Sequence, residues 1–201
     1  MVENPFNPGY YTEGDLESVG FRSLGENVRI AKNTTIVGVQ NITIGSNVRI
    51  DGYSTIIAGD SGWLRVGSYV HIGGYCYLSA GDGIGLDDFS GLSQGVRIYS
   101  RTDDYSGEYL TNPTVPEQYT GVRRGAVELG RHVIVGSGTV ILPALTLGEG
   151  SAVGALSLVT KSLDPWCVFS GRPARRLKTR SKRILELEKK LKNEFAKDDH
   201  L

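Results

Sequence analysis

Residues 86–98 read LDDFSGLSQGVRI, with an aliphatic side chain at every sixth position, at Leu86, Leu92 and Ile98. The same period runs through most of the 201-residue chain, and its aliphatic anchors group in threes. A period of six matches neither the period of about 3.6 of a helix nor the alternation of a hairpin strand. It is typical of short strands joined by tight corners and wound into a parallel β-helix. The anchors predict six coils: Leu24, Ile30, Ile36; Ile44, Ile50, Ile56; Val66, Ile72, Leu78; Leu86, Leu92, Ile98; Leu129, Val135, Ile141; and Leu147, Val153, Val159.

The breaks in this rhythm share one position in the coil. Gaps longer than six residues follow only the third anchor of a coil, at Ile36, Ile56, Leu78 and Ile98. All insertions therefore leave from one corner of a triangular prism. A sandwich of short strands would instead show turn signals at about 8–12-residue spacing, and these are not present. We expect an all-β fold with an N-terminal arm and short helix over 1–23, a parallel β-helix over 24–165 with a loop excursion over 99–128, and an exit turn with a C-terminal helix over 166–201.

The segments outside the repeat favour helices. The run TEGDLESVGF predicts a short helix with Thr12 as its N-cap and with Leu16 and Val19 facing inward. The C-terminal tail places apolar residues on one face of a second helix, at Ile184, Leu187, Leu191 and Phe195.

The composition excludes several classes of protein. Lys+Arg and Asp+Glu balance at 22 each, so no global field favours nucleic acid or an anionic membrane. No apolar run approaches the roughly 18–20 residues of a membrane span, and the N-terminus lacks the apolar core of a signal peptide. Two cysteines, Cys76 and Cys167, cannot form a disulfide framework. We expect a cytoplasmic protein with no membrane span and no nucleic-acid partner.

Glycine is the one outlier, with 27 residues in 201, nearly twice the usual ~7%. Because glycine adopts positive φ without steric cost, this number predicts many tight corners. Several glycines directly follow an anchor, at Gly25, Gly45, Gly67, Gly73, Gly130, Gly136, Gly148 and Gly154.

The long interruption carries carboxylates but no histidine between residues 99 and 128. A sugar hydroxyl is a very weak acid, and its activation near pH 7 calls for a positioned base such as histidine. A neutral amine needs only orientation and a place for its proton after attack on a thioester. An ionised aspartate, with an ordinary pKa of about 3.9, aligns an amine and stabilises its developing positive charge. The loop therefore favours an amine as acceptor.

The closing run VGALSLVTKSLDPWCVFSGRPARRLK (153–178), together with the repeat and the single long loop, resembles the hexapeptide-repeat acyltransferases. The resemblance covers residues 11–180. It implies a left-handed parallel β-helix and a homotrimer, with active sites between neighbouring subunits and coenzyme A bound along the groove there.

Residues 103–107, Asp-Asp-aromatic-Ser-Gly, and the proline-containing stretch after them are similar to the N-acyltransferases of nucleotide-linked deoxysugars, such as that of the anthrose pathway. This similarity implies acetyl-CoA or another acyl-CoA as co-substrate, with no permanently bound cofactor and no metal. It also implies an amino sugar carried by dTDP ahead of UDP or GDP, as in polysaccharide biosynthesis.

The resemblance assigns catalytic roles to three residues. Asp103 matches an aspartate that approaches the acceptor amine in the relatives, and the alternative is a turn-forming aspartate. Ser93 matches a serine near the acceptor, and strand alternation points it outward, although no histidine lies nearby in sequence to make it a nucleophile. His71 also points outward, as a hydrogen-bond partner or proton relay for the acceptor or as a surface histidine with a structural contact. His132 has a weaker claim.

Further residues are candidates for binding the two substrates. The candidates for the sugar substrate are Tyr99, Arg101, Asp104 and Tyr105. Asp104 is also the expected turn-former of its pair, and most aromatic side chains simply pack. The candidates for the acyl-CoA are Gly138, Ala155, Lys161, Pro173 and Arg175, since small residues let pantetheine approach the backbone and cations meet its phosphates. A corner that needs positive φ explains a glycine equally well.

Three other functions fit parts of the sequence. A sugar or glycan O-acetyltransferase of the same fold is the nearest alternative. A γ-type carbonic anhydrase shares the prism but needs three imidazoles on zinc, and with His200 in the tail at most two histidines remain in the repeats. A non-catalytic β-helix predicts regular ladders of outward threonine without a long loop, and the interruption at 99–128 argues against it.

Overall fold

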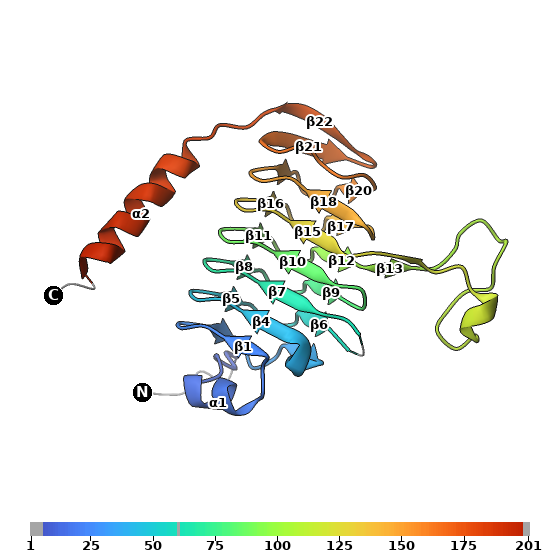
Figure 1. The fold of residues 1–201 in the computed structure, drawn as a ribbon, viewed down its shortest axis with the longest axis horizontal. Helices are drawn as coiled ribbons and strands as arrows, with labels where there is room; N and C mark the ends of the chain where they lie inside the picture. Colours follow the sequence, from blue (N-terminus) through green and yellow to red (C-terminus); the bar gives the residue numbers. More distant parts are fainter. Residues whose placement is uncertain (1–5, 60, 199–201) are drawn as a thin grey trace.

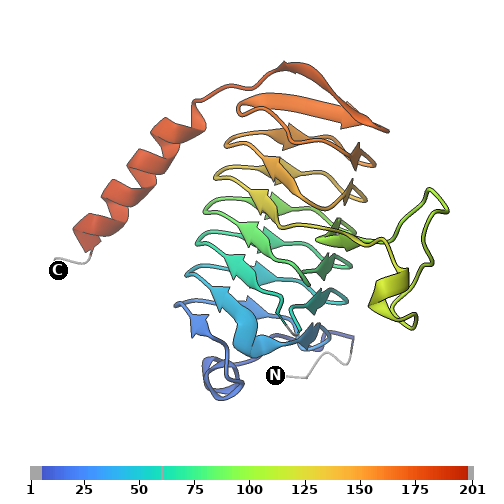
Figure 2. The same ribbon diagram turned by 45° about the vertical axis from the view of Figure 1, so that its right-hand side comes forward.

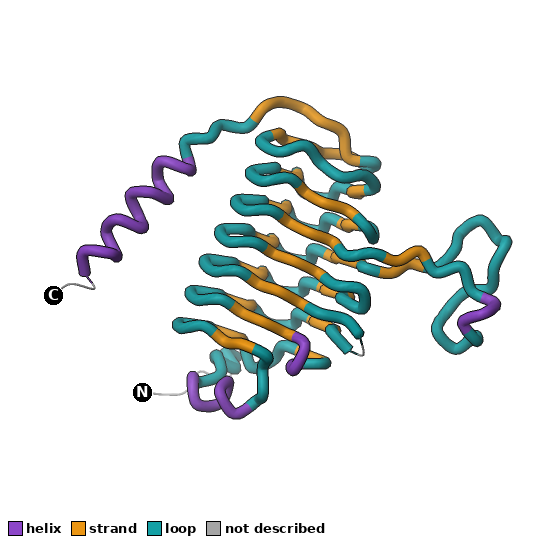
Figure 3. The backbone as a smooth tube through the Cα atoms, in the orientation of Figure 1, coloured by secondary structure: helices purple, strands orange, loops and turns teal. Residues whose placement is uncertain are grey.

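Each coil contributes one short strand to each of three sheets, which form the sides of a prism (Figures 1 and 3). The computed structural model describes residues 6–59 and 61–198. Sheet 1 contains β1 (Ser23–Leu24), β4 (Ile42–Ile44), β7 (Leu64–Val66), β10 (Ile84–Leu86), β15 (Val127–Leu129) and β18 (Leu145–Leu147). Sheet 2 contains β2 (Arg29–Ile30), β5 (Arg49–Ile50), β8 (His71–Ile72), β11 (Gly91–Leu92), β16 (Ile134–Val135), β19 (Ala152–Val153), β21 (Cys167–Gly171) and β22 (Ala174–Thr179). Sheet 3 contains β3 (Thr35–Val37), β6 (Thr55–Ile57), β9 (Tyr77–Ser79), β12 (Arg97–Tyr99), β17 (Val140–Ile141) and β20 (Leu158–Val159).

The anchors stack in register from coil to coil, and neighbouring coils pair in parallel. In sheet 2, for example, Ile72 pairs with Leu92, and Leu92 pairs with Val135. All anchors are buried except Leu24 and Ile36 of the first coil, which are half-buried. Because each buried aliphatic side chain contributes about 1.5–3 kcal/mol, the stacked anchors are the main source of stability. The predicted parallel β-helix and its six coils are confirmed.

All four predicted insertions leave from the corner that connects sheet 3 to sheet 1. The first three lie between β3 and β4, where the 3₁₀ helix η1 (Val39–Asn41) is found, between β6 and β7, and between β9 and β10. The fourth, between β12 and β15, forms an arm that stands away from the prism (Figure 2). The base of the arm is an antiparallel pair, β13 (Arg101–Thr102) and β14 (Arg123–Arg124), and its outer part contains η2 (Glu117–Tyr119). The predicted long loop excursion is therefore present between β12 and β15.

The strained corners do not coincide with the glycines that follow the anchors. A β-carbon on Gly136 would lie 2.5 Å from the amide nitrogen of Ala155, and one on Gly25 would lie 2.6 Å from the carbonyl carbon of Gly45. These glycines are needed because successive coils approach closely, so the expectation of positive φ at them is wrong. Positive φ occurs instead three residues after an anchor, mostly at residues other than glycine: Asn27, Asn47, Tyr53, Tyr69, Tyr75, Phe89, Gly95, His132, Gly138, Ala144, Gly150 and Leu156.

A shorter seventh coil follows the six predicted ones. Leu163 bridges to Leu147 and Phe169 pairs with Val153, and both added side chains are buried. β22 then returns antiparallel to β21 and forms the last strand of sheet 2 (Figure 1). Its exposed Arg175, Arg176 and Lys178 are typical of an edge strand that avoids pairing with another chain.

The predicted N-terminal helix is present as α1 (Glu13–Ser18). Thr12 caps it, since its side chain accepts from the amide of Asp15 while the Asp15 carboxylate accepts from the amide of Thr12. Leu16 is buried as expected. Val19 is 45% exposed, so the expectation that it faces inward is wrong, because the helix ends at Ser18 before Val19.

The second predicted helix is α2 (Ile184–Asp198), which lies beside the corner between sheets 1 and 2 (Figure 2). A hollow of 470 Å³ between helix and prism is lined in part by Phe89, Ile134, Ile184, Leu187 and Leu191. The predicted apolar face thus meets the prism, while the side chain of Phe195 and all of His200 lie outside the described residues. Within residues 6–59 and 61–198, no helix has both the length and the apolar character that a membrane crossing requires.

A substitution of Gly45 tests the close approach of the coils. A β-carbon there would lie 2.8 Å from the carbonyl carbon of Gly67, so we expect Gly45→Ala to lower the free energy of unfolding by about 1–3 kcal/mol. Urea unfolding measures this change. Gly59→Ala is the matched control, because its β-carbon meets nothing within 4 Å. Equal stability of the two variants would contradict the explanation.

Candidate active site

The three predicted catalytic residues lie on two different sides of one prism. His71 belongs to β8 and Ser93 directly follows β11, so both lie on sheet 2. Asp103 lies in the arm, which leaves from the corner between sheets 3 and 1. In a three-sided prism that corner is opposite sheet 2. A single chain therefore keeps Asp103 apart from His71 and Ser93.

His71 is held by a carboxylate from the neighbouring strand. Its Nε2 lies 2.8 Å from Oδ2 of Asp51. Arg49 donates to both oxygens of the same carboxylate, at 2.7 and 2.9 Å, and the hydroxyl of Tyr10 donates to it at 3.2 Å. The hydrogen bond from Arg49 is the largest reason that the pKa of Asp51 falls to about 2, with a further contribution from His71. Asp51 is thus a fixed negative charge that orients the His71 ring.

Ser93 lies in a row of outward positions that becomes flat toward the C-terminal coils. After Ser93 the row continues with Gly136 and Gly154, which leave the surface of sheet 2 without side chains at these positions. Two predicted acyl-CoA residues flank this row, namely Gly138 at the next corner, with φ of +68°, and the exposed Ala155. A flexible chain can approach the backbone along such a surface.

The other three predicted acyl-CoA residues lie near the C-terminal end of the prism. Lys161 follows β20, Pro173 lies in the turn between β21 and β22, and Arg175 lies in β22, and all three are exposed. Beside them, Nε of Arg172 donates to the carbonyl of Leu156 at 2.7 Å. This concentration of cations suits a ligand with several phosphates.

Asp103 is half-buried and lines a hollow of 430 Å³ in the arm. Ser79, Asn112, Glu117 and Arg124 also line it. Arg124 donates to the carboxylate of Glu117, which leaves Asp103 as a second carboxylate on the same hollow. A polar or cationic group is the ligand that such a lining favours.

Arg101 fastens the arm to the prism. Its Nε donates to the carboxylate of Asp82 and its Nη2 donates to the carbonyl of Gly81 at 2.7 Å. The hydroxyl of Ser100 donates to the carbonyl of Ser79 at 2.8 Å and accepts from the amide of Asp82 at 2.9 Å. These contacts give Arg101 a structural role, and its contact with the sugar substrate stays a prediction.

The remaining predicted sugar-binding residues have different surroundings. Asp104 accepts from the amide of Ser106 at 3.0 Å and from its hydroxyl, and this hydroxyl is the largest cause that lowers the pKa of Asp104. The prediction that it forms a turn is confirmed. Tyr105 is 90% exposed on the arm. The ring of Tyr99 lies 5.7 Å from that of Tyr77 on the outer face of sheet 3.

Sequence reasoning missed Arg49 and Asp51. Asp51 directly follows the second anchor of its coil, the position that Gly73 and Ser93 occupy in the next two coils. Aligning the coils by their second anchors would have placed this carboxylate in the same row as Ser93.

A second missed residue explains His132. Glu188 of α2 is buried and accepts from Arg131, from Lys192 at 2.7 Å and from Nε2 of His132 at 2.8 Å. Burial raises the pKa of Glu188, but the hydrogen bonds from Lys192 and His132 outweigh it and the pKa falls. His132 therefore helps to attach α2 to the prism.

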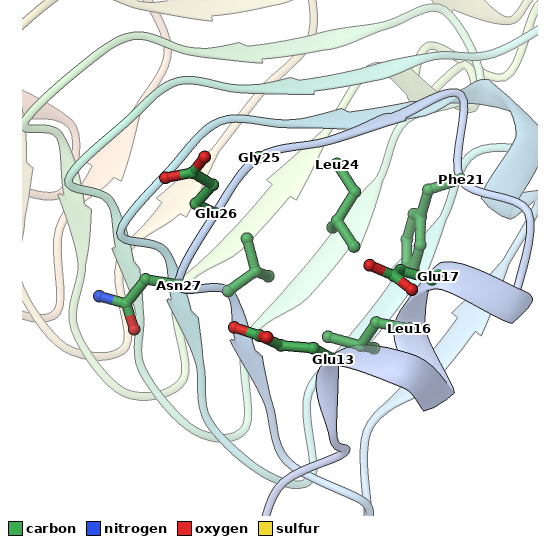
Figure 4. Close-up of a pocket in the computed structure, with 9 residues that line it drawn as sticks. Glu13, Leu16, Glu17, Phe21, Leu24, Gly25, Glu26 and Asn27 are labelled. Atoms are coloured by element: carbon green, nitrogen blue, oxygen red, sulfur yellow. The ribbon is translucent and has the colours of Figure 1, made fainter.

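A further hollow, of 380 Å³, lies beneath α1 (Figure 4). It combines the apolar side chains of Leu16 and Leu24 with the carboxylates of Glu13, Glu17 and Glu26. These carboxylates repel anionic ligands, and none of the predicted site residues lines the hollow.

Comparison with known proteins identifies the family. No family model matches the sequence. The dTDP-4-amino-4,6-dideoxy-D-glucose acyltransferase of Escherichia coli is 41% identical over 179 residues, which cover 89% of this chain and 93% of the relative. The chain belongs to this acyltransferase family. The family expected from residues 103–107 and 153–178 is therefore confirmed.

Solved structures agree with the assignment to the acyltransferase family. AntD, an N-acyltransferase from Bacillus cereus in complex with dTDP and 3-hydroxybutyryl-CoA, superposes with a TM-score of 0.88 at 40% identity and covers 98% of this chain and 100% of its own. A maltose O-acetyltransferase from Clostridium difficile, with a TM-score of 0.57 and 21% identity over 90% of this chain and 80% of its own, shares the fold.

The carboxylate of Asp51 makes stability depend on acidity. Because its pKa is about 2 in the folded protein against 3.8 ordinarily, its contribution is present above pH 4 and is lost as the pH falls toward 2. We expect Asp51→Asn to be less stable than the wild type at pH 7 and to lose less stability between pH 4 and pH 2. Thermal unfolding midpoints across this range measure both effects, and Asp164→Asn controls for the change in net charge. Parallel profiles for Asp51→Asn and the wild type would refute the assignment.

Proposed function

We propose that the protein transfers an acyl group from an acyl-CoA to the amino group of a nucleotide-linked deoxysugar, with dTDP-4-amino-4,6-dideoxyglucose as the first candidate. The observation that carries this proposal is the 41% identity to the Escherichia coli acyltransferase named for that sugar, across nearly the full length of both chains. AntD supports it further, since it has been crystallised with dTDP and 3-hydroxybutyryl-CoA and with dTDP-4-amino-4,6-dideoxyglucose and coenzyme A.

The reaction is a direct transfer. The amine nitrogen attacks the thioester carbon and forms the amide bond, the carbon–sulfur bond breaks, and the proton lost from nitrogen ends on the thiol of coenzyme A. Asp103 aligns the amine and stabilises the positive charge that develops on nitrogen. Ser93 hydrogen-bonds the reacting groups, while Asp51 fixes His71 beside them. AntD variants at an aspartate and at a serine have been crystallised, and these are the residue types at positions 103 and 93.

The complete site needs a second copy of the chain. Asp103 and Ser93 lie on opposite sides of one prism, so an arm that reaches sheet 2 of a neighbour brings them together. Sheet 3 offers a surface for this association, because seven of its outward positions are apolar: Val37, Ile57, Tyr77, Tyr99, Val140, Leu142 and Leu158. Thr35, Thr55, Ser79 and Arg97 are polar positions on the same face. A ring of three copies satisfies every arm and every sheet 2.

The role of Asp103 is tested by substitution. We expect Asp103→Asn to lower kcat/KM for amine acylation by about 100-fold or more, since the carboxylate that holds the ammonium charge is gone. Release of free thiol from acetyl-CoA with a dTDP-amino sugar, or with its hydroxyl analogue, measures the rate. Glu108→Gln, an exposed carboxylate in the same arm, is the control and should keep wild-type activity. Thiol release with the hydroxyl analogue alone would favour the O-acetyltransferase alternative.

The shared site is tested by mixing inactive variants. Asp103→Asn and a blocking Ser93→Leu variant should each be inactive, whereas subunits refolded together should recover activity at about a quarter of their sites, where both partners supply the native residue. Light scattering should give a mass of three times the 21.8 kDa chain. A monomer, or a mixture as inactive as its parts, would show that one chain forms the site by itself.

A further inference from the structure

The corner between sheets 2 and 3 carries two tyrosines that stay open to solvent. The rings of Tyr53 and Tyr75 stack with centroids 5.0 Å apart and planes 11° apart. The two residues are 62% and 63% exposed. Both have positive φ, at +58° and +61°, a conformation that costs free energy for any side chain. Positive φ recurs at matching corners such as Ala144 and Leu156, so the feature particular to Tyr53 and Tyr75 is the exposed stack of two aromatic rings.

A second stack of aromatic rings, at another corner of the prism, is covered by a helix. Between sheets 1 and 2, the rings of Tyr69 and Phe89 stack 4.7 Å apart, and the ring of His132 continues the stack. There the helix α2 contributes a cover, since Lys192 lies over the Phe89 ring and Glu188 holds His132. The helix α2 thus covers the stack of Tyr69, Phe89 and His132. By contrast, Tyr53 and Tyr75 each remain more than half exposed.

A hollow of 340 Å³ adjoins the exposed stack of Tyr53 and Tyr75. Its lining includes both tyrosines, Gly52, Gly74, and two residues with amide side chains, Asn33 and Gln94. Aromatic faces beside hydrogen-bonding amides suit a flat heterocycle with polar edges, such as a pyrimidine base. The carboxylate of Asp51 forms another part of the wall.

A row of basic side chains on the outer face of sheet 2 lies beside Asp51. Arg29, Arg49 and His71 occupy matching positions on β2, β5 and β8 and all are exposed. Asp51 is the carboxylate that pairs with two of them, Arg49 and His71. The next position of the row is Gly91, on the strand that Ser93 follows. Two arginines and an imidazole in such a row offer several N–H donors to two linked phosphates.

We propose that this surface binds the nucleotide part of the acceptor, a pyrimidine nucleoside diphosphate, with the base against Tyr53 and Tyr75 and the diphosphate on Arg29, Arg49 and His71. The proposal rests on the proposed function only in taking a nucleotide-linked sugar as the acceptor. The sugar then extends toward Ser93. The side-chain-free row at Gly136 and Gly154 remains for the other substrate.

Calorimetric titration with dTDP, without sugar and without acyl-CoA, tests the proposal. We expect Tyr75→Asn and Arg49→Gln each to weaken dTDP binding about 10-fold or more and to leave the affinity for coenzyme A unchanged. Asparagine already occupies the same backbone conformation at Asn27 and Asn47, so Tyr75→Asn keeps the corner intact.

Two matched variants serve as controls. Tyr69→Asn makes the same change at positive φ on the other corner, and Arg65→Gln removes an arginine that is paired with carboxylates on the outer face of sheet 1. Both should bind dTDP as the wild type does. Light scattering on every variant reports whether assembly is retained.

The outcomes separate the two proposals. Wild-type affinity for dTDP in both Tyr75→Asn and Arg49→Gln overturns the nucleotide site and leaves the proposed function intact. Loss of assembly in Tyr75→Asn shows that the exposed stack contacts a second copy and also overturns the nucleotide site. A wild-type protein that binds no dTDP, UDP or GDP overturns both proposals.

Discussion

The close stacking of successive coils is the constraint on which the rest of the structure depends. Strands of neighbouring coils lie about 4.8 Å apart, so each anchor must lie over the anchor of the next coil. For that reason the first and second anchors, and the second and third, are six residues apart in every predicted coil. The backbone after an anchor comes so close to the next coil that Gly136 has no room for a β-carbon. Additional residues enter only at the corner between sheets 3 and 1, and the arm is the longest such addition.

The parts of the fold that follow this constraint could be predicted from the sequence, because the same spacing of anchors recurs in each coil and confirms the assignment of the coil before it. The seventh coil was not predicted because Leu163 follows Val159 by only four positions, which breaks the period of six. The glycines were misread because the sequence shows that glycine recurs but not whether φ or a close approach demands it. Tyr53 and Tyr75 show that this fold accepts positive φ at large side chains.

The candidate site was predictable to a similar degree. Alternation along a strand placed His71 and Ser93 on the outer surface, and the residue types of the arm indicated a carboxylate partner for an amine. The contact between His71 and Asp51 could not be predicted in the same way, since it depends on the register between coils of unequal length. The outer face of sheet 2 has two parts. The part around Asp51 carries charged side chains, and the part beyond Ser93 is nearly flat, a division that suits two reactants of different chemistry.

The arm and the folded prism depend on different residues. No anchor lies between Ile98 and Leu129, and the arm is held by the β13–β14 pair and by the contacts of Arg101 with Asp82 and Gly81. We therefore expect mutations in the outer arm to leave the stability of the prism unchanged. Grafting an arm from a homologue onto this prism would test whether the arm sets the acceptor preference.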